Sequence, residues 1–276
     1  METVIHPESK RMLDAIVHDA PHALLVTGPV GIGLTIAAKE AANLLGGYVI
    51  TVLPEKNEKV DVEKGTITVD SIRRLYDTTR TIEPAGRTII IDYAERMAPA
   101  AQNAFLKLLE EPSEGTHFIL LTHQPELLLP TITSRVQKVD LRPVTPAQSK
   151  ALLDALNVLD VTKRAQLLFI AEGLPAALTR LVSDDSVFDA RASIVKDARS
   201  YITGSAYQRL VLAKKYKDSR ETALVFIEDA LKLLRRTIAQ NGDVNSLKLA
   251  SRLEVLHKRI TEQGNVRLQL SAAVMV

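Results

Sequence analysis

The sequence has no cysteine and no tryptophan, and aromatic residues make up only 4% of it. Without cysteine the chain has no disulfide bonds and no thiolate zinc site. So few aromatic residues argue against a protein that binds single-stranded nucleic acid mainly by base stacking. No apolar run approaches the roughly 18 residues of a membrane-spanning helix, and the polar start "METVIHPESK" lacks the apolar core of a signal peptide. We therefore expect a cytoplasmic protein with no membrane partner.

The chain has 276 residues, 46% of them hydrophobic, which is enough for two or three domains with cores of their own. Its charge is unevenly distributed. The segment after residue 185 has 16 basic and 9 acidic residues, whereas the part before it has 19 basic and 24 acidic residues. A basic C-terminal third is typical of a surface for nucleic acid or an acidic partner, and equally of a solvated helical face, so both interpretations stay open.

Short apolar runs alternate with amphipathic stretches over the first 140 residues. Runs such as "TIIID" are apolar throughout, which is expected of strands that are buried on both faces of a parallel sheet. Strands that alternate with helices predict a parallel sheet with flanking helices. The expected strands are 23–27, 47–52, 87–92, 117–122 and 136–141, and the expected helices between them are 33–45, 70–80 and 99–111.

Beyond Pro146 the strand signal stops and only helical patterns remain. The segment "SDDS" (183–186) is expected to be a linker. Apolar stripes over 224–238 and 249–260 predict long helices after it, and the apolar tail 265–276 is expected to pack as a last helix. The sequence therefore predicts three domains: an α/β domain (1–143), a small helical domain (144–184) and a helical C-terminal domain (185–276).

The stretch "GPVGIGLT" (28–35) matches the phosphate-binding pattern G-x-x-x-x-G-K-[ST] at every fixed position except one. It lies between an expected strand and an expected helix. Glycines in such a loop let backbone amides hold phosphate oxygens at the helix N-terminus, and the hydroxyl holds Mg²⁺. Leu34 stands where the phosphate-binding lysine belongs. The candidate nucleotide-binding residues in the loop are Gly28, Gly31, Gly33 and Thr35.

The stretch "IIIDYAE" supplies the second half of such a site. Asp92 ends a buried strand, where the aspartate associated with Mg²⁺ is expected. Tyr93 occupies the position of the glutamate that orients the attacking water, and a phenol with a pKa of about 10 is a poor base near neutral pH. Glu95 lies two residues further on, outside that position. Two altered catalytic positions favour a scaffold that kept the shape of a nucleotide site and lost hydrolysis; a glycine-rich turn without a ligand is the alternative.

Three segments point to a family: "AAQNAFLKLLEEP" (100–112), "FILLT" (118–122) and "LLPTITSR" (128–135). In order and spacing they resemble the clamp-loader AAA+ subunits of bacterial DNA polymerase III, over roughly residues 4–180 and more loosely beyond. The resemblance implies a P-loop α/β domain, a helical lid, and a collar domain that holds a hetero-oligomeric ring together. It implies as partners ATPase subunits and a clamp-opening subunit, with the sliding clamp and primer–template DNA engaged through the complex.

The resemblance also implies roles for individual residues. Arg135 matches the family's arginine finger, which points into the ATP site of a neighbouring subunit; a helix cap or a carboxylate partner is the alternative for this residue. Thr122 matches a γ-phosphate sensor and is expected to be vestigial, with His123 beside it at the surface. The lid segment "EGLPAALTRL" (172–181) lacks the arginine that reaches nucleotide in ATP-hydrolysing relatives, since Arg180 is expected to lie too far along the helix.

We therefore predict a non-hydrolysing stator subunit with no required cofactor and no zinc, in which the loop at 28–35 retains at most weak binding of ATP, ADP or phosphate. A charged loop (53–66) stands in for the family's zinc module. An active clamp-loader ATPase and a DNA-binding AAA+-like adaptor outside clamp loading are the alternatives. Two basic rows are expected to face solvent or other subunits, with DNA binding as the alternative: Lys232, Arg235 and Arg236, and Lys248, Arg252 and Arg259.

Overall fold

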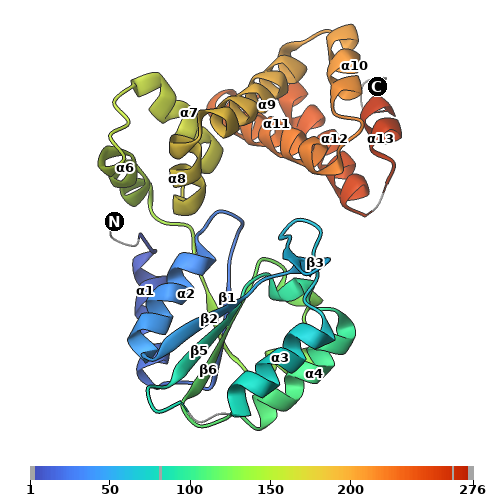
Figure 1. Cartoon of the computed structure of the whole chain (residues 1–276). Helices are drawn as coiled ribbons and strands as arrows, with labels where there is room; N and C mark the ends of the chain where they lie inside the picture. Colours follow the sequence, from blue (N-terminus) through green and yellow to red (C-terminus); the bar gives the residue numbers. More distant parts are fainter. Residues whose placement is uncertain (1–3, 81–82, 263, 273–276) are drawn as a thin grey trace. The chain divides into compact units, whose positions relative to one another are not determined.

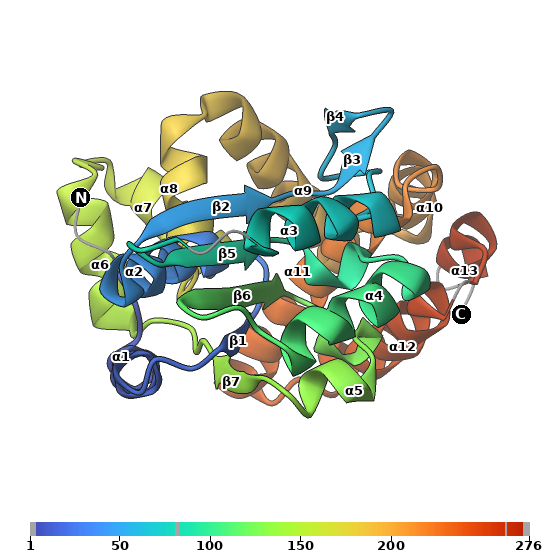
Figure 2. The ribbon, with the colours of Figure 1, turned by 60° about the horizontal axis from the view of Figure 1, so that its bottom comes forward.

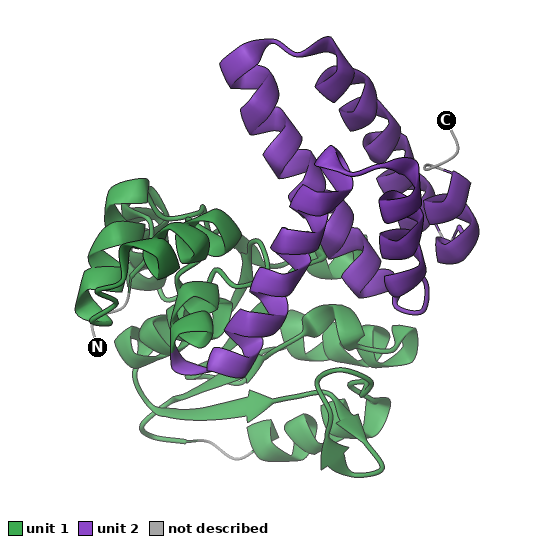
Figure 3. Cartoon of the chain, turned by 90° about the horizontal axis from the view of Figure 1, so that it is seen from above, with its two compact units in different colours: residues 1–182 green, residues 183–276 purple. Residues whose placement is uncertain are grey.

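A computed structural model describes residues 4–80, 83–262 and 264–272 of the chain. The chain divides into two compact units, Met1–Val182 and Ser183–Val276 (Figure 3). The first unit contains a parallel sheet and the second is helical throughout its described part. The further division of the first unit into an α/β domain and a lid at residues 143 and 144 stays a prediction.

The predicted α/β fold is confirmed by a five-stranded sheet in the order β2-β5-β6-β1-β7, in which every neighbouring pair of strands is parallel. Each predicted strand agrees with an observed one to within a residue at either end. The strands are β1 (Ala23–Thr27), β2 (Tyr48–Val52), β5 (Arg87–Ile91), β6 (Thr116–Thr122) and β7 (Gln137–Asp140).

Helices cover both faces of the sheet (Figures 1 and 2). Alternate residues of a strand point to opposite faces. In β1, Leu24 and Val26 pack with α1 and α2, whereas Leu25 packs with α3 and α4. Every residue of β1 and β5 is buried, which explains why these runs are apolar throughout. The flanking helices are α1 (Pro7–His18), α2 (Leu34–Leu45), α3 (Val69–Arg80) and α4 (Pro99–Glu110).

The charged segment at 53–66 is not simply a loop, because it contains a small hairpin of β3 (Glu55–Lys56) and β4 (Lys59–Val60). Asn57 and Glu58 form its turn with φ angles of 53° and 61°. Positive φ at both central residues is the backbone geometry that closes a two-residue hairpin. The sequence gives little sign of it, because both strands are short and rich in charge.

Three short helices lie between β5 and β7 in the sequence, and three longer ones follow β7. Thr145 begins the first of these longer helices with a capping box, in which its hydroxyl accepts from the backbone N–H of Gln148 and the Gln148 side chain accepts from the N–H of Thr145. The short helices are η1 (Ala94–Arg96), η2 (Pro125–Leu127) and α5 (Pro130–Thr133), and the longer ones are α6 (Pro146–Ala155), α7 (Val161–Ala171) and α8 (Pro175–Ser183).

The second unit packs its helices around Phe226, which is fully buried against the rings of Tyr201 and Tyr216. The predicted apolar stripes are confirmed, since Leu234 and Leu253 lie in this core. The helices are α9 (Asp185–Thr203), α10 (Ala206–Lys215), α11 (Arg220–Asn241), α12 (Val244–Thr261) and α13 (Val266–Ala272). The end of the predicted last helix, 273–276, lies outside the described residues.

The predicted linker at 183–186 is wrong. Helix α8 extends to Ser183, and Asp184 is the N-cap of α9, where its carboxylate accepts from the backbone N–H groups of Ser186 and Val187. Aspartate and serine are typical of helix N-caps as well as of loops, which explains the error. In the described part of the chain, no helix combines the length and the apolar character that crossing a bilayer requires.

Candidate functional site

The glycine-rich loop connects the carboxyl end of β1 to the first turn of α2. Gly31 and Gly33 have φ angles of +86° and +100°, which a residue with a Cβ adopts only with strain. The hydroxyl of Thr35 donates to a carboxylate oxygen of Asp92 over 3.0 Å, so the loop meets the end of β5. The structure therefore brings together the two halves of the predicted nucleotide site.

The position of the missing lysine lies in the core of the first unit. Leu34 is 4% exposed and belongs to the apolar cluster that α1, α2 and the sheet share, against which Leu174 also packs. An apolar side chain held in this way supplies no positive charge to a phosphate group. The charges of the loop therefore do not fit a bound nucleoside triphosphate, although its backbone has the shape of a phosphate loop.

The first turn of α8 packs directly on this loop. The backbone N–H of Ala177 donates to the carbonyl of Gly31 over 3.0 Å. A Cβ on Gly31 would lie 2.7 Å from the Cβ of Ala177, and a Cβ on Gly33 would lie 3.6 Å from that of Ala176. The residues of α8 nearest the loop are thus small and uncharged. Arg180 lies further along on the exposed side of α8, and its positive charge acts on the hydroxyl of Tyr93.

Asp92 and Tyr93 are partly buried, and both have raised pKa values. Burial raises the pKa of the Asp92 carboxyl, and hydrogen bonds from Thr35 and from the backbone N–H of Tyr93 oppose the rise. The pKa of the Tyr93 phenol is also raised, chiefly by burial and then by the negative charges of Asp92 and Glu95. A phenol with a raised pKa is an even poorer general base than the sequence indicates.

Thr122 and His123 lie at the carboxyl end of β6, beside the loop, since Thr122 is paired with Thr27. The buried Thr122 hydroxyl accepts from the backbone N–H of Gln124 over 3.0 Å. His123 is half-buried, and its Nδ1 lies 2.7 Å from the carbonyl oxygen of Gly28, to which it donates. The expectation that His123 is a surface residue is therefore wrong. Its position after a buried strand, at the edge where the loop also lies, is the signal that sequence reasoning missed.

Arg135 lies near the amino ends of the strands, at the end of the sheet opposite to the glycine-rich loop. It comes two residues before β7, whose first residue, Gln137, pairs with Leu24, whereas the glycine-rich loop follows Thr27 at the other end of the same parallel pair. At about 3.3 Å per residue, this separates the Arg135 backbone from the loop by roughly 15 Å. The structure does not bring Arg135 to the nucleotide site of its own chain.

The Arg135 guanidinium is held at the surface by an ion pair and by hydrogen bonds to Thr131 and Ser134. Its Nη2 lies 3.0 Å from a carboxylate oxygen of Glu110, and its Nη1 donates to the carbonyl of Thr131 over 3.0 Å. The Arg135 side chain is 39% exposed and that of Glu110 is 49% exposed. Both residues line an open hollow of about 540 Å³, together with His22 and Gln137. The sequence analysis gave a carboxylate partner as an alternative for Arg135, and Glu110 is such a partner. Both side chains are accessible from outside the chain.

Gln102 joins α4 to the segment that leads to Arg135, a role that sequence reasoning missed. Its side chain is 4% exposed. Its amide nitrogen donates to the carbonyls of Met97 and Leu127 over 3.2 Å, and its amide oxygen accepts from the backbone N–H of Leu129 over 2.8 Å. A buried polar side chain with its bonds satisfied in this way fixes the backbone around it. Gln102 therefore fixes the start of α5, which Arg135 closely follows.

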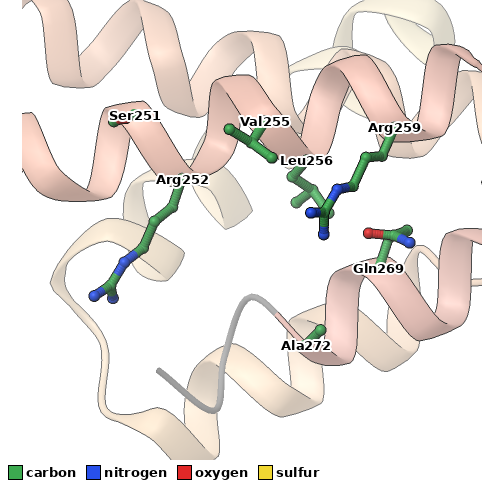
Figure 4. A pocket seen from close by; sticks show the side chains of 7 residues that line it. All are labelled: Ser251, Arg252, Val255, Leu256, Arg259, Gln269 and Ala272. Carbon is green, nitrogen blue, oxygen red and sulfur yellow. The ribbon is translucent and has the colours of Figure 1, made fainter.

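The basic rows of the second unit lie among acidic and apolar groups. Arg235 pairs with Glu254 over 3.2 Å, and His257 lies 3.0 Å from Glu228. Arg252 and Arg259 line a hollow of about 320 Å³ between α12 and α13 (Figure 4). Among the residues with described positions, no group of three or more His, Asp or Glu side chains is arranged to hold a metal ion.

Several known proteins are similar to this chain in sequence. The family described as "DNA polymerase III, delta subunit" matches residues 49–145. The delta′ subunit of DNA polymerase III from Pseudomonas aeruginosa is 32% identical over 208 residues, which are 66% of this chain and 61% of that protein. The delta′ subunit from Bacillus subtilis is 37% identical over 116 residues, which are 42% of this chain and 34% of that one. Over these matched parts, the chain is similar to DNA polymerase III delta′ subunits.

Other clamp-loader and AAA+ proteins are similar to the chain as well. The gamma/tau subunit of Mycobacterium tuberculosis is 32% identical over 151 residues, which are 48% of this chain and 26% of that protein. A gamma subunit-related protein from Thermotoga maritima has a similar fold, with a TM-score of 0.52 at 19% identity over 96% of this chain and 97% of the other. In the delta′ and gamma/tau subunits, the matched region is between about a quarter and about three fifths of the full length of the protein.

Proposed function

We propose that the chain is the non-hydrolysing stator of a DNA polymerase III clamp loader, and that it supplies Arg135 as an arginine finger to nucleotide bound by a neighbouring ATPase subunit. The observation that supports this most directly is the position of Arg135. It lies at the edge of the sheet opposite to the chain's own loop, half-exposed and with its guanidinium at an open hollow. An arginine placed there acts on a phosphoryl group only if another chain brings that group to it.

The altered loop supports the non-hydrolysing part of the proposal. Leu34 is buried in the core, so no lysine charge is available to a β- or γ-phosphate. Tyr93 replaces the glutamate that would orient water, and small residues of α8 lie against the loop. A nucleotide would lack the charges that stabilise phosphoryl transfer. Weak binding of ATP, ADP or phosphate to the backbone of the loop is compatible with the proposal, and turnover is not.

Arg135 has chemistry suited to the partner site. A guanidinium keeps its charge at all relevant pH values and presents several N–H donors in a fixed plane. Directed at a transferring phosphoryl group, it stabilises the negative charge of the transition state, and removal of such a finger lowers the rate by orders of magnitude. The gamma/tau proteins similar to this chain indicate the kind of ATPase neighbour it would serve.

The test is reconstitution of the complex with its ATPase and clamp-opening subunits, followed by ATPase measurement with the sliding clamp and primed DNA. Arg135→Ala is expected to lower the DNA-stimulated rate at least severalfold while the complex still assembles, as judged by gel filtration. Arg73→Ala is the matched control, because Arg73 is exposed on α3 and, among the described residues, pairs with Asp70 alone, over 3.2 Å. An unchanged rate in an intact Arg135→Ala complex would overturn the arginine-finger assignment.

The isolated chain tests the main alternative, an active motor subunit. The proposal expects no ATP hydrolysis above background from the purified protein. Hydrolysis that disappears in Asp92→Ala would instead assign catalysis to this chain's own loop. The proposal also expects weak DNA binding by the isolated chain, since basic residues such as Arg235 are paired with acidic ones. In the complete ring the chain would work in the cytoplasm, where the complex places the sliding clamp on primer–template DNA.

A further inference from the structure

Glu110 is the last residue of α4 and the ion-pair partner of Arg135, although 25 positions separate the two residues in the sequence. Its placement is unfavourable for α4 itself. The C-terminal end of a helix has partial negative charge, so an acidic side chain there destabilises the helix. Glu110 therefore does not stabilise α4 by its position, and its favourable interaction is the ion pair with Arg135.

The next residue offers a direct comparison. Glu111 is the C-cap of α4 and is also exposed, but in the described part of the chain it forms no ion pair. The two carboxylates are adjacent and have the same charge and chemistry, and only that of Glu110 contacts the guanidinium. Any effect of Glu110 that is absent for Glu111 thus arises from the contact with Arg135 and not from the general charge of this surface.

We propose that Glu110 is a positioning residue that competes with nucleotide phosphate for Arg135, and so lowers ATP hydrolysis by the assembled complex before DNA binds. This proposal rests on the proposed function of Arg135. In the resting state the carboxylate occupies Nη2 of Arg135 and offsets part of its charge. A phosphoryl group that approaches Arg135 must displace this carboxylate, because two anions at the same face of one guanidinium repel each other.

The size of the effect follows from the exposure of the pair. Exposed ion pairs of this kind alter an equilibrium by a factor of up to about five. The contact is therefore weak enough for a phosphoryl group with more than one negative charge to displace it, and strong enough to lower a basal rate measurably. In a DNA-bound complex in which Arg135 contacts phosphate, Glu110 is already displaced and has less effect.

The experiment uses the reconstituted complex and measures ATPase with and without primed DNA. Glu110→Gln keeps the size of the side chain and an oxygen acceptor but removes the charge. It is expected to raise the DNA-independent rate about two- to fivefold, and to change the DNA-stimulated rate less, so that the ratio of the two rates falls. Glu111→Gln, the matched control, is expected to leave both rates unchanged. Thermal melting of each variant establishes that the fold is intact.

A double mutant identifies the route of the effect. In the Arg135→Ala background, Glu110→Gln is expected to change neither rate, because the group through which it acts is gone. An equal rise with and without Arg135 would overturn the proposal. A fall in both rates of Glu110→Gln would also overturn it, since Glu110 would then support the finger instead of competing for it. If Arg135→Ala lowers the rate and Glu110→Gln is silent, only this proposal fails; if Arg135→Ala is silent, the proposed function fails.

Discussion

Replacement of Gly31 by alanine tests the contact between the glycine-rich loop and α8. The added Cβ would lie 2.7 Å from the Cβ of Ala177, closer than Cβ atoms approach without a shift of the backbone. The same backbone makes the bond from the Ala177 N–H to the Gly31 carbonyl, so a shift of α8 also weakens that bond. The substitution therefore acts on the turn of α8 that contacts the loop.

Two contributions add to the loss of stability. Gly31 has a φ of +86°, and an alanine in the left-handed region is destabilised by roughly 1–2 kcal/mol. Crowding of a packed site adds typically about 1–3 kcal/mol. Gly33 separates the two contributions, because it lies in the left-handed region with φ +100° and ψ +41°, and a Cβ there would make only ordinary contacts, at 3.6 Å and beyond. We therefore expect Gly33→Ala to lower the free energy of unfolding by the first contribution alone and Gly31→Ala by both.

The assay is urea denaturation of the full chain, followed by circular dichroism of the helices. Both glycines belong to the first unit, so both variants affect the same unfolding transition. The double variant Gly31→Ala, Ala177→Gly removes the Cβ that is crowded, and is expected to recover most of the difference between the two single variants. Equal stability of Gly31→Ala and Gly33→Ala would refute the packing of α8 on the loop, and with it part of the argument against nucleotide turnover.

Three further predictions concern buried polar groups. Burial raises the pKa of Asp92, so the folded wild type gains stability as the pH falls through that raised pKa toward the ordinary value of 3.8. The Asp92→Asn variant lacks this titration. Its free energy of unfolding, measured by urea denaturation, is expected to exceed that of wild type at pH 7, and this difference is expected to shrink on acidification. Gln102→Leu leaves the carbonyls of Met97 and Leu127 and the N–H of Leu129 without their partner. It is expected to lower the free energy of unfolding by about 2–4 kcal/mol. It is also expected to lower the Arg135-dependent ATPase rate of the complex. Arg191→Met leaves the buried carboxylate of Asp229 unpaired, and is expected to lower the denaturation midpoint by an amount equivalent to about 3–5 kcal/mol, most of which Asp229→Leu in the same chain should restore.

The sheet and the first half of the site could be predicted because each rests on a local pattern. Strands such as β1 and β5 are buried throughout, and Gly31 and Gly33 mark the loop positions with positive φ. Thr35 and Asp92 follow from the same rule, since parallel strands end at one edge of a sheet and place the residues after them close together. The structure confirms that these two side chains are hydrogen-bonded.

The remaining features depend on contacts between distant segments, which local patterns do not record. The bond between Ala177 and Gly31 joins residues 146 positions apart, and neither residue has a side chain that indicates a partner. Glu110 and Arg135 are each ordinary exposed charges in the sequence, and only the fold pairs them. The linker prediction was wrong for a different reason: aspartate is common in loops, but Asp184 caps a helix.

The two edges of the sheet explain why a chain with an altered loop would keep this fold. At the carboxyl ends of the strands, Leu34 and Tyr93 stand where a hydrolysing site is expected to have a lysine and a glutamate, yet the core there is intact, with Leu34 packed in it. The opposite edge depends on that core, because β7, which follows Arg135, is paired with β1. A loss of the sheet would displace Arg135 whether or not the loop binds nucleotide. A finger that serves a neighbour therefore requires the scaffold of a nucleotide-binding domain without requiring its chemistry.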